Sequence, residues 1–152
     1  MTATSPPAAT SSVCTCFRLR RASRRVTQVY DHELASAGLS LNQYSILRGT
    51  EREPRVLGGL AEELGMDRTT LTRNLSPLMD AGLLETVRGK DARQRVIALT
   101  EEGRVRLAAA KPLWHQAQSV IDTMLGEAAV QRLHGELDRL DSLLRQHLGE
   151  PA

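Results

Sequence analysis

The apolar residues between positions 13 and 37 recur with the period of an α-helix. Ser12 is placed to cap this helix, and Gly38 is placed to end it in the left-handed conformation. Residues 1–12 consist mainly of Thr, Ser, Ala and Pro and carry too little apolar surface to fold. The pattern therefore predicts a disordered N-terminal tail over residues 1–12, followed by one long helix.

The segment after Gly38 predicts a second helix. Ser40 and Gln43 have the spacing of a capping box, in which each side chain bonds the backbone amide of the other residue. The helix is expected over residues 41–51, and Pro54 prevents it from continuing.

The next apolar stretch predicts two short helices joined by a tight turn. The first covers residues 57–64 and ends at Gly65. The second begins after a capping Asp67 and ends at Ala81. Two short helices in this arrangement indicate a helix-turn-helix.

Two strand-like runs, residues 83–87 and 95–100, flank a basic loop that contains glycine. They predict a β-hairpin with a long tip. Thr100 is placed to cap a further helix, which is expected to run to about Leu125 with an interruption near Pro112.

The last predicted helix begins at Gly126 and carries a near-heptad stripe of aliphatic residues. The stripe consists of Val130, Leu133, Leu137, Leu140, Leu144 and Leu148. Aromatic residues make up only 3% of the chain, so a monomer has few large side chains with which to cover the whole stripe. It favours pairing with a second copy, and the alternative is packing within one chain.

Composition restricts the class of protein. Of 152 residues, 41% are hydrophobic and 25% are charged, as in ordinary globular proteins. No apolar run has the length of a membrane span, and the N-terminus lacks the basic and apolar regions of a secretory signal. The two cysteines are too few for a disulfide framework. Together these features predict a cytoplasmic protein that does not bind a membrane.

Motifs for catalysis and metal binding are absent from the sequence. We find no phosphate-binding glycine loop, nucleophile elbow or paired-carboxylate signature, so we expect neither an enzyme nor a cofactor. The four histidines, His32, His115, His134 and His147, lack the His-x-x-x-His spacing and a nearby cysteine pair. We therefore expect no metal site, and binding is left as the class of function.

The basic residues are mostly arginine, since only Lys90 and Lys111 among the 20 are lysines. Arginine suits the recognition of phosphates and base edges. A GC-rich genome produces the same bias, so composition alone does not separate the two explanations.

A helix-turn-helix followed by a basic hairpin is the winged-helix arrangement. Side chains that suit the major groove cluster at the start of the second helix: Arg68, Thr69, Thr70, Arg73 and Asn74. Side chains that suit phosphates or the minor groove lie on the hairpin: Arg88, Lys90, Arg93 and Arg95. Each cluster alone is also typical of a solvated surface, but their order along the chain favours double-stranded DNA as the partner.

The chain resembles the MarR (multiple antibiotic resistance regulator) family of bacterial transcription factors in two motifs, LAEELGMDRTTLTRNLSPLMDAGLLE and KDARQRVIALTEEGR. The second is similar to the Asp-x-Arg wing of that family, followed by a strand and a Leu-Thr-x-x-Gly helix start. The resemblance covers about residues 14–147. It implies a mainly α fold with a small β-hairpin wing, in which helical dimerisation regions flank a winged helix-turn-helix.

The resemblance also implies a homodimer. Residues 13–38 and 101–149 would form the dimerisation helices, and residues 39–100 would form the DNA-binding domain. The named residues of the second helix would face the major groove of a pseudo-palindromic operator. Arg93 would enter the minor groove, with its position braced by Asp91.

Cys14 and Cys16 are candidates for a redox sensor. Five arginines follow them before the first acid, Asp31, and both guanidinium groups and a helix N-terminus favour the reactive thiolate. The Cys16-Phe17 pair resembles the hydroperoxide-sensing branch of the family, although that branch is mostly apolar where arginines follow here. A bridge between the two cysteines is not expected within a helix, so oxidation would form a sulfenic acid, a mixed disulfide or a bond between subunits. The alternative is that both cysteines pack in a dimer core.

Small-molecule sensing is the other property that the resemblance implies, through a pocket between the DNA-binding lobe and the dimerisation helices. Its candidate lining residues are Tyr30, His32, Tyr44, Arg48 and Trp114. Each of them is equally typical of a core or a surface position.

The sequence therefore predicts a homodimeric transcriptional regulator, most often a repressor in this family. An oxidant or a small phenolic-type effector would release the dimer from DNA. Release requires that the effector modify or bind one arrangement of the dimer helices in preference to the other. The alternative from another class is a winged-helix module that binds a protein and does not read DNA.

Overall fold

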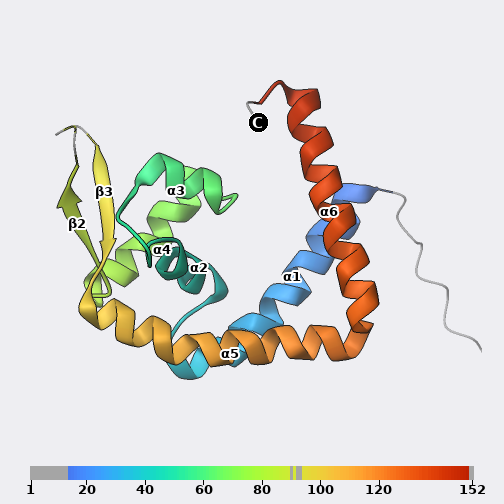
Figure 1. Cartoon of the computed structure of the whole chain (residues 1–152), viewed down its shortest axis with the longest axis horizontal. Coiled ribbons are helices and arrows are strands. Elements are labelled where there is room, and N and C mark those ends of the chain that lie inside the picture. Colours follow the sequence, from blue (N-terminus) through green and yellow to red (C-terminus); the bar gives the residue numbers. More distant parts are fainter. Residues whose placement is uncertain (1–13, 90, 92–93, 151–152) are drawn as a thin grey trace, which may run out of the picture.

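The computed structural model describes residues 14–89, 91 and 94–150. Along the chain lie α1 (Thr15–Leu34), the 3-10 helix η1 (Ala35–Ala37), α2 (Leu41–Gly49), β1 (Arg55–Val56), α3 (Leu57–Glu63), α4 (Arg68–Asp80), β2 (Leu84–Arg88), β3 (Arg95–Leu99), α5 (Glu101–Leu125) and α6 (Glu127–Leu148). Figure 1 shows a lobe built from α2, α3, α4 and the sheet, and an arm in which α5 runs from this lobe to α6. None of the helices described is long and apolar enough to cross a membrane.

The sheet is antiparallel, and its strand order is β1-β3-β2. Leu84 pairs with Leu99 at the base of the β2–β3 hairpin, and Arg88 pairs with Arg95 at its outer end. β1 was not expected from the sequence, because two residues are too few to show the alternation of a strand. Its pairing with β3 attaches the segment before α3 to the hairpin.

The lobe is held together by aliphatic side chains from α2, α3, α4, the hairpin and the first turns of α5. The fully buried members of this core are Ile46, Leu47, Leu60, Leu71, Leu75, Leu78, Leu83, Ile97 and Leu107. Each helix buries one face here, so its opposite face points to solvent. The core thereby determines which residues of α4 face outward.

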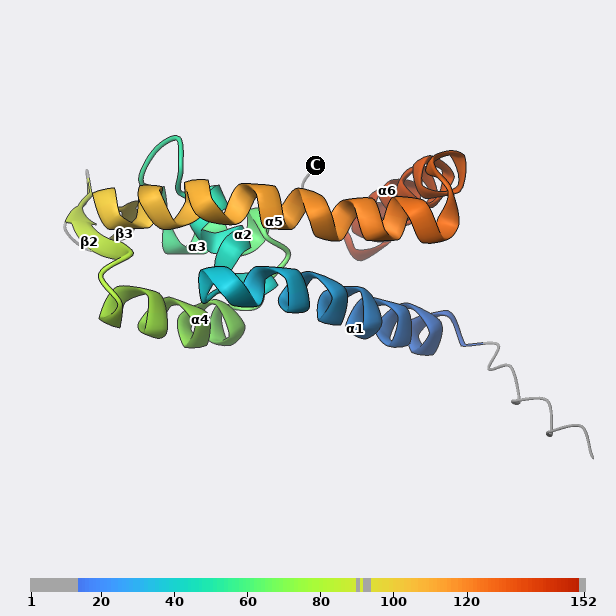
Figure 2. The same cartoon turned by 90° about the horizontal axis from the view of Figure 1, so that it is seen from below.

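The arm is joined to the lobe through α5, which packs against α1 along its middle (Figure 2). Trp114 of α5 lies between Tyr30 of α1 and Tyr44 of α2, with ring centroids 6.0 and 6.1 Å away. The Tyr30 hydroxyl donates a hydrogen bond of 2.5 Å to Oε1 of Gln118 on α5. Three aromatic rings thus connect the first, second and fifth helices.

The outer parts of α1 and α6 contribute little to this core. Residues 14–26 and 131–139 are exposed throughout. α6 crosses α1 in Figure 1, but Figure 2 shows the two helices at different heights, so the crossing is not a packed contact. Two helical segments with apolar side chains therefore extend beyond the core.

The predicted helix caps of the lobe are confirmed. The Ser40 hydroxyl accepts from the Gln43 amide and the Gln43 side chain accepts from the Ser40 amide, which completes the capping box. Asp67 caps α4 and Thr100 caps α5, each through a side-chain oxygen. Gly38 has a φ of 69°, the left-handed conformation that its predicted place after a helix requires.

Several helix boundaries differ from the sequence prediction. α3 and α4 end, and α6 begins, one residue away from the predicted positions, and the first two helices differ by more. The first helix begins at Thr15 with Cys14 as its N-cap, and the predicted cap, Ser12, lies outside the described residues. The second helix ends at Gly49, earlier than predicted, and its C-cap Thr50 bonds through its hydroxyl to the carbonyl groups of the last turn.

The predicted interruption near Pro112 is wrong, since α5 is one continuous helix over Glu101–Leu125. A proline inside a helix removes one backbone donor and crowds the preceding turn. Here the buried side chains of Ala110 and Ala117 lie on either side of it and hold both halves of the helix against the same core.

Gly103 lets the first turn of α5 approach the hairpin closely. A β-carbon at this position would lie 2.1 Å from the Leu83 carbonyl oxygen and 2.7 Å from Cδ1 of Leu99. Both distances are far shorter than van der Waals contact, and the first involves backbone, which cannot rotate away. A larger residue therefore has to displace the start of α5.

We predict that Gly103→Ala lowers the free energy of unfolding by about 1–3 kcal/mol, because the added methyl group overpacks this junction. Gly135→Ala is the matched control, since no atom lies within 4 Å of a β-carbon there, in the middle of α6. The control is expected to raise stability by about 0.5–1 kcal/mol. Urea unfolding followed by circular dichroism measures both, and equal effects of the two substitutions would contradict the prediction.

Candidate nucleic-acid interface and effector sites

The outward face of α4 carries the candidate base-reading residues. Leu71, Leu75 and Leu78 are buried and fix the rotation of this helix in the lobe. Three of the residues predicted to contact DNA are exposed: Thr69 and Arg73 on the opposite side, and Arg68 at the first position of the helix. A short helix with exposed arginine and threonine at its N-terminal half suits insertion into the major groove.

Thr70 and Asn74, also predicted to contact DNA, are half-buried and already bonded within α4. The Thr70 hydroxyl donates to Oδ2 of Asp67 at 2.6 Å, as part of the helix cap. Nδ2 of Asn74 donates to the Thr70 carbonyl oxygen at 2.9 Å. The helical period could have separated these two residues from Thr69 and Arg73, because it places Thr69 and Arg73 opposite the buried leucines and Thr70 and Asn74 beside them.

Hydrogen bonds at the start of α4 hold the pKa of the Asp67 carboxyl below its usual range. The hydrogen bond from the Thr70 hydroxyl lowers this pKa most. The Thr70 backbone amide, which donates to Oδ1 at 2.8 Å, has the next largest effect. The ionised carboxylate also interacts favourably with the positive end of the helix dipole. Asp67 therefore positions the first turn that presents Arg68 and Thr69.

The hairpin places two arginines directly opposite each other. Arg88 of β2 and Arg95 of β3 are cross-strand partners, and both are exposed. Nη2 of Arg95 also lies 3.6 Å from Sδ of Met79, so this side chain links the wing to the end of α4. Like charges in such a pair repel each other. A phosphate between them would relieve this repulsion.

Two predicted wing contacts, Lys90 and Arg93, lie outside the described residues. Asp91, which was predicted to brace Arg93, is exposed, and its backbone carbonyl accepts from the Gln94 amide at 3.0 Å. The bracing contact itself stays a prediction.

A cleft of about 630 Å³ lies between α2, the loop that follows it and α5. Three of the predicted pocket residues line it: Tyr44, Arg48 and Trp114. Tyr30 contacts Trp114 but does not line the cleft, and His32 lies on the exposed surface of α1. Burial is the main cause that raises the pKa of both tyrosines.

Sequence reasoning missed six cationic or otherwise titratable side chains of this cleft: Arg52, Glu53, Arg55, Glu63, Lys111 and His115. Lys111 and His115 flank Trp114 on α5, one turn before it and directly after it. The helical period around a candidate tryptophan could have suggested Lys111. Arg52 carries no such signal, because it lies in the irregular segment after α2.

Cys14 and Cys16 are both exposed in the single chain. The sequence argument against a bridge between them assumed that both lie within a helix, and that assumption is wrong. Cys14 precedes the helix and has an extended backbone, with φ −72° and ψ 114°, whereas Cys16 belongs to the first turn. Helix geometry therefore does not hold the two thiols apart.

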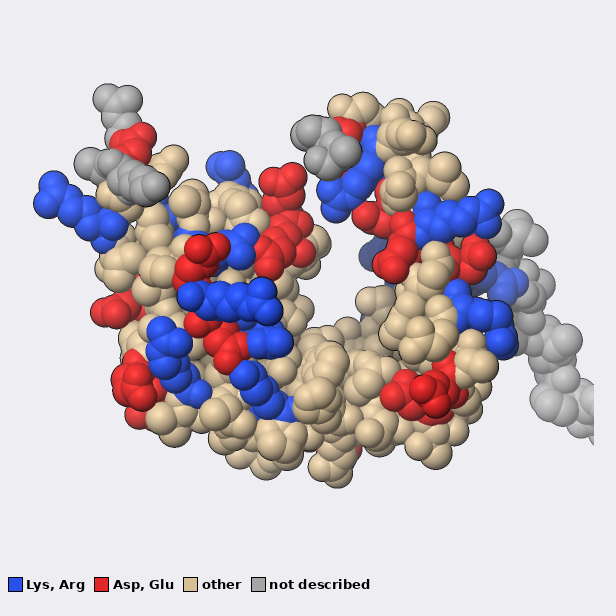
Figure 3. Space-filling view, viewed as in Figure 1, with Lys and Arg blue, Asp and Glu red and all other residues tan. Residues whose placement is uncertain are grey.

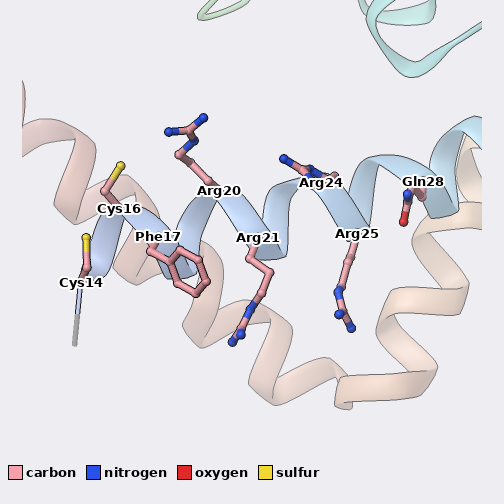
Figure 4. Close-up of a pocket in the computed structure, with 8 residues that line it drawn as sticks. All are labelled: Cys14, Cys16, Phe17, Arg20, Arg21, Arg24, Arg25 and Gln28. Atoms are coloured by element: carbon pink, nitrogen blue, oxygen red, sulfur yellow. The ribbon is translucent and has the colours of Figure 1, made fainter. Parts of the chain in front are cut away.

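The two cysteines share a shallow groove of about 910 Å³ with the arginines of α1 (Figure 4). Its other lining residues are Phe17, Arg20, Arg21, Arg24, Arg25 and Gln28. The guanidinium group of Arg21 lies over the Phe17 ring, 5.3 Å from its centroid. The predicted cationic surroundings of the cysteines are confirmed.

The charged surface differs between the parts of the molecule. Figure 3 shows acidic and basic side chains interleaved on the lobe, uncharged side chains along the arm below, and a hollow between the lobe and α6. Among the described residues, no three His, Cys, Asp or Glu side chains gather as a metal site would require.

Comparison with known proteins gives a family match and a curated relative. A helix-turn-helix domain family matches residues 42–87. The chain is 31% identical over 113 residues to the organic hydroperoxide resistance transcriptional regulator of Bacillus subtilis (strain 168), and this match covers 73% of the chain and 72% of the relative.

Solved structures of the same fold include two regulators bound to DNA. The M. tuberculosis transcriptional regulator MosR in complex with DNA has 36% identity and a TM-score of 0.74, covering 87% of this chain and 98% of that one. The transcriptional repressor CouR, bound to a 23-mer DNA duplex, has 28% identity and a TM-score of 0.75, covering 84% and 92%.

The three-stranded sheet, the helix-turn-helix of α3 and α4 and the basic hairpin define a winged helix-turn-helix protein of the class that regulates transcription. Together with these relatives, they show that the chain belongs to the MarR family of transcriptional regulators. The relatives named here are regulators and not enzymes.

We predict that Asp67→Ala lowers the melting temperature at neutral pH, because α4 loses its cap. Since folding lowers the pKa of Asp67, its stabilisation is present above the unfolded value of 3.8 and is lost as the pH falls through the lower folded value. Thermal unfolding of wild type and variant across the acid range should show the difference closing only below that unfolded value. A difference that persists unchanged in acid would refute the role of the carboxylate.

Proposed function

We propose that this chain is a homodimeric transcriptional repressor that binds a pseudo-palindromic operator. One observation carries the proposal: the first half of α4 exposes Arg68, Thr69 and Arg73, and the same lobe carries the opposed wing arginines Arg88 and Arg95, of which Arg95 contacts Met79 at the end of α4. The DNA complex of MosR, at 36% identity, supports it. Residues 39–100 serve as the DNA-binding domain.

In this proposal, Arg73 and Arg68 contact base edges and phosphates in the major groove, where a guanidinium group can bond a guanine with two donors. Thr70 and Asn74 contribute base contacts only by exchanging their bonds to Asp67 and to the Thr70 carbonyl. The wing extends the interface into the minor groove, through the side chains Arg88, Lys90, Arg93 and Arg95 with Asp91 as the brace.

The exposed stripe of α6 supports a dimer in which residues 13–38 and 101–149 pair with a second copy. Within one chain Leu137 is 39% exposed, Leu144 48% and Leu148 66%, and only Val130 of the stripe is buried. A partner copy would cover these side chains, and the hollow beside α6 leaves room for it (Figure 3). Twofold symmetry then sets two recognition helices about 34 Å apart, as a palindromic site requires.

Oxidation of Cys16 is the proposed signal for release. The B. subtilis relative is an organic hydroperoxide resistance regulator, and the exposed thiols of Cys14 and Cys16 lie among arginines at the start of α1. Attack of the Cys16 thiolate on a peroxide breaks the O–O bond, oxidises the sulfur to a sulfenic acid and reduces the peroxide to an alcohol. Because Cys14 lies outside the helix, its thiol can then condense with that sulfenic acid, with loss of water.

The cleft beside Trp114 supports a small-molecule effector as a second route to release. Its volume of about 630 Å³ lies within the usual range for small ligands, and it combines aromatic rings with cations. CouR, of the same fold, has also been solved with p-coumaroyl-CoA.

We predict that Arg73→Ala weakens binding to the operator by about 1–3 kcal/mol, or about 5- to 150-fold, and relaxes sequence preference. Fluorescence anisotropy at one stated salt concentration, with DNA from upstream of the protein's own coding region, measures the change. Arg132→Ala on α6 is the control and should leave affinity unchanged. Wild-type affinity in Arg73→Ala would instead favour a winged-helix module that binds another protein.

We predict that Leu137→Asp converts the dimer to a monomer, because a carboxylate replaces the centre of the apolar stripe. Light scattering should give twice the chain mass of 16.7 kDa for the wild type and the single mass for the variant. Gln146→Asp adds the same charge on the far side of α6 and should remain dimeric. A wild type that is monomeric at micromolar concentration would refute the dimer.

We predict that cumene hydroperoxide lowers the operator affinity of the reduced protein at least tenfold, and that dithiothreitol restores it. Cys16→Ser should abolish the response, and Cys14→Ser should retain the first oxidation but accumulate the sulfenic acid, which dimedone labelling with mass spectrometry detects. A full response in the double serine variant would exclude both cysteines as sensors.

A further inference from the structure

The side chain of Arg95 connects the wing to the recognition helix through a sulfur atom. Its Nη2 lies 3.6 Å from Sδ of Met79, which belongs to the last turn of α4. Met79 is half-buried and packs against the core of the lobe, whereas Arg95 and the contact itself are exposed. The sulfur therefore lies at the edge of the lobe, beside a cation of the wing.

A thioether is a weak partner for this cation. The sulfur of methionine is a poor hydrogen-bond acceptor, whereas a guanidinium group bonds strongly to carboxylates and phosphates. Arg88 stands opposite Arg95 and repels it, and the ion pairs formed among the described residues do not include Arg95. With Met79 reduced, Arg95 can therefore leave the sulfur for a phosphate of DNA at little cost.

Oxidation of Met79 would replace this weak partner by a strong one. Methionine sulfoxide is polar, and its oxygen accepts hydrogen bonds far better than the thioether sulfur does. Because Nη2 of Arg95 is 3.6 Å from Sδ, an oxygen added on that side of the sulfur comes within hydrogen-bond reach of the guanidinium group. The sulfoxide then competes with phosphate for the same donors.

We propose that Met79 is a second oxidation site of this chain, whose sulfoxide holds Arg95 against α4 and weakens the contact of the wing with DNA. The consequence for DNA rests on the proposed function, because it requires Arg95 to bind the operator. The site is separate from the two cysteines, which lie at the start of α1. It acts on a DNA contact directly, without a change in the arm.

The oxidant that fits a thioether is hypochlorous acid. Its oxygen is transferred to Sδ: the S–O bond forms, the O–Cl bond breaks, the sulfur loses two electrons, and chloride and a proton are released. A thioether is a weaker nucleophile than a thiolate, so an alkyl hydroperoxide oxidises Cys16 in preference to Met79. The two sites therefore answer to different oxidants.

Met124 provides an internal comparison. It is 65% exposed near the end of α5, and is thus more accessible than the half-buried Met79. It lies at the opposite end of α5 from the hairpin, so its sulfoxide is expected to form without changing DNA binding (Figure 1). A response to oxidation that depends on Met79 and not on Met124 would follow from the contact with Arg95.

The test uses the full chain with Cys14→Ser and Cys16→Ser, so that no thiol can respond. After treatment with hypochlorite, mass spectrometry of peptides should find sulfoxide at Met79, and anisotropy should show operator affinity lowered about fivefold or more. The slope of log affinity against log salt concentration should fall by about one, as for the loss of one phosphate contact. Methionine sulfoxide reductases A and B should restore binding, and dithiothreitol should not.

Three further variants in this background separate capture of Arg95 from damage to the core. Met79→Leu should lose the response to hypochlorite, and the matched control Met124→Leu should keep it. Arg95→Ala should bind the operator more weakly from the start and lose no further affinity on oxidation, because the captured group is already absent.

Three outcomes would overturn the proposal: no sulfoxide at Met79, a full response in Met79→Leu, or an equal loss of affinity in Arg95→Ala. The last would show that oxidation acts by loosening the core of the lobe. Nuclear magnetic resonance of the arginine side chains gives a readout without DNA, since oxidation should shift the Arg95 Nε signal in the parent and not in Met79→Leu. Failure of the untreated protein to bind DNA would refute the proposed function, while this signal would still decide the capture of Arg95.

Discussion

α5 packs against two separate parts of the molecule and thereby fixes the position of the lobe relative to the arm. At its start, Gly103 brings the helix against the Leu83 carbonyl, closer than any side chain would allow. At its middle, Trp114 lies between Tyr30 and Tyr44 and joins α1 to α2. Because both contacts belong to one continuous helix, the lobe and the arm have a defined relative orientation. A palindromic site can be read only if that orientation is defined.

Cationic side chains lie close together at two sites, where a nearby anion lowers their mutual repulsion. On the wing, Arg88 and Arg95 face each other across the strands, which is unfavourable until a phosphate lies between them. Beside the cleft, Arg48 and Lys111 are paired within the chain with Glu51. The first arrangement is ready for an external partner, and the second already holds an internal one.

Both proposed effector sites lie on the helices that connect the two parts of the molecule. The cysteines stand at the outer end of α1, where the helix extends beyond the core. The cleft lies further along, where α5 meets α2. A change at either site therefore acts on the connection between the arm and the lobe and leaves the core of the lobe intact. This favours regulation through the orientation of α4, since the leucines that hold that helix are not touched.

The order of most elements and the approximate positions of their ends could be predicted from the amino-acid sequence, because a cap or a terminal glycine acts within a few residues. Ser40 with Gln43, Asp67 and Thr100 each begin a helix where their spacing predicted it. The family motifs also identified the winged helix. Three features could not be predicted in this way: the pairing of β1 with the hairpin, the continuation of α5 through Pro112 and the contact of Glu51 with Lys111, 60 residues away. These features depend on contacts between residues distant in the sequence, which local patterns do not encode.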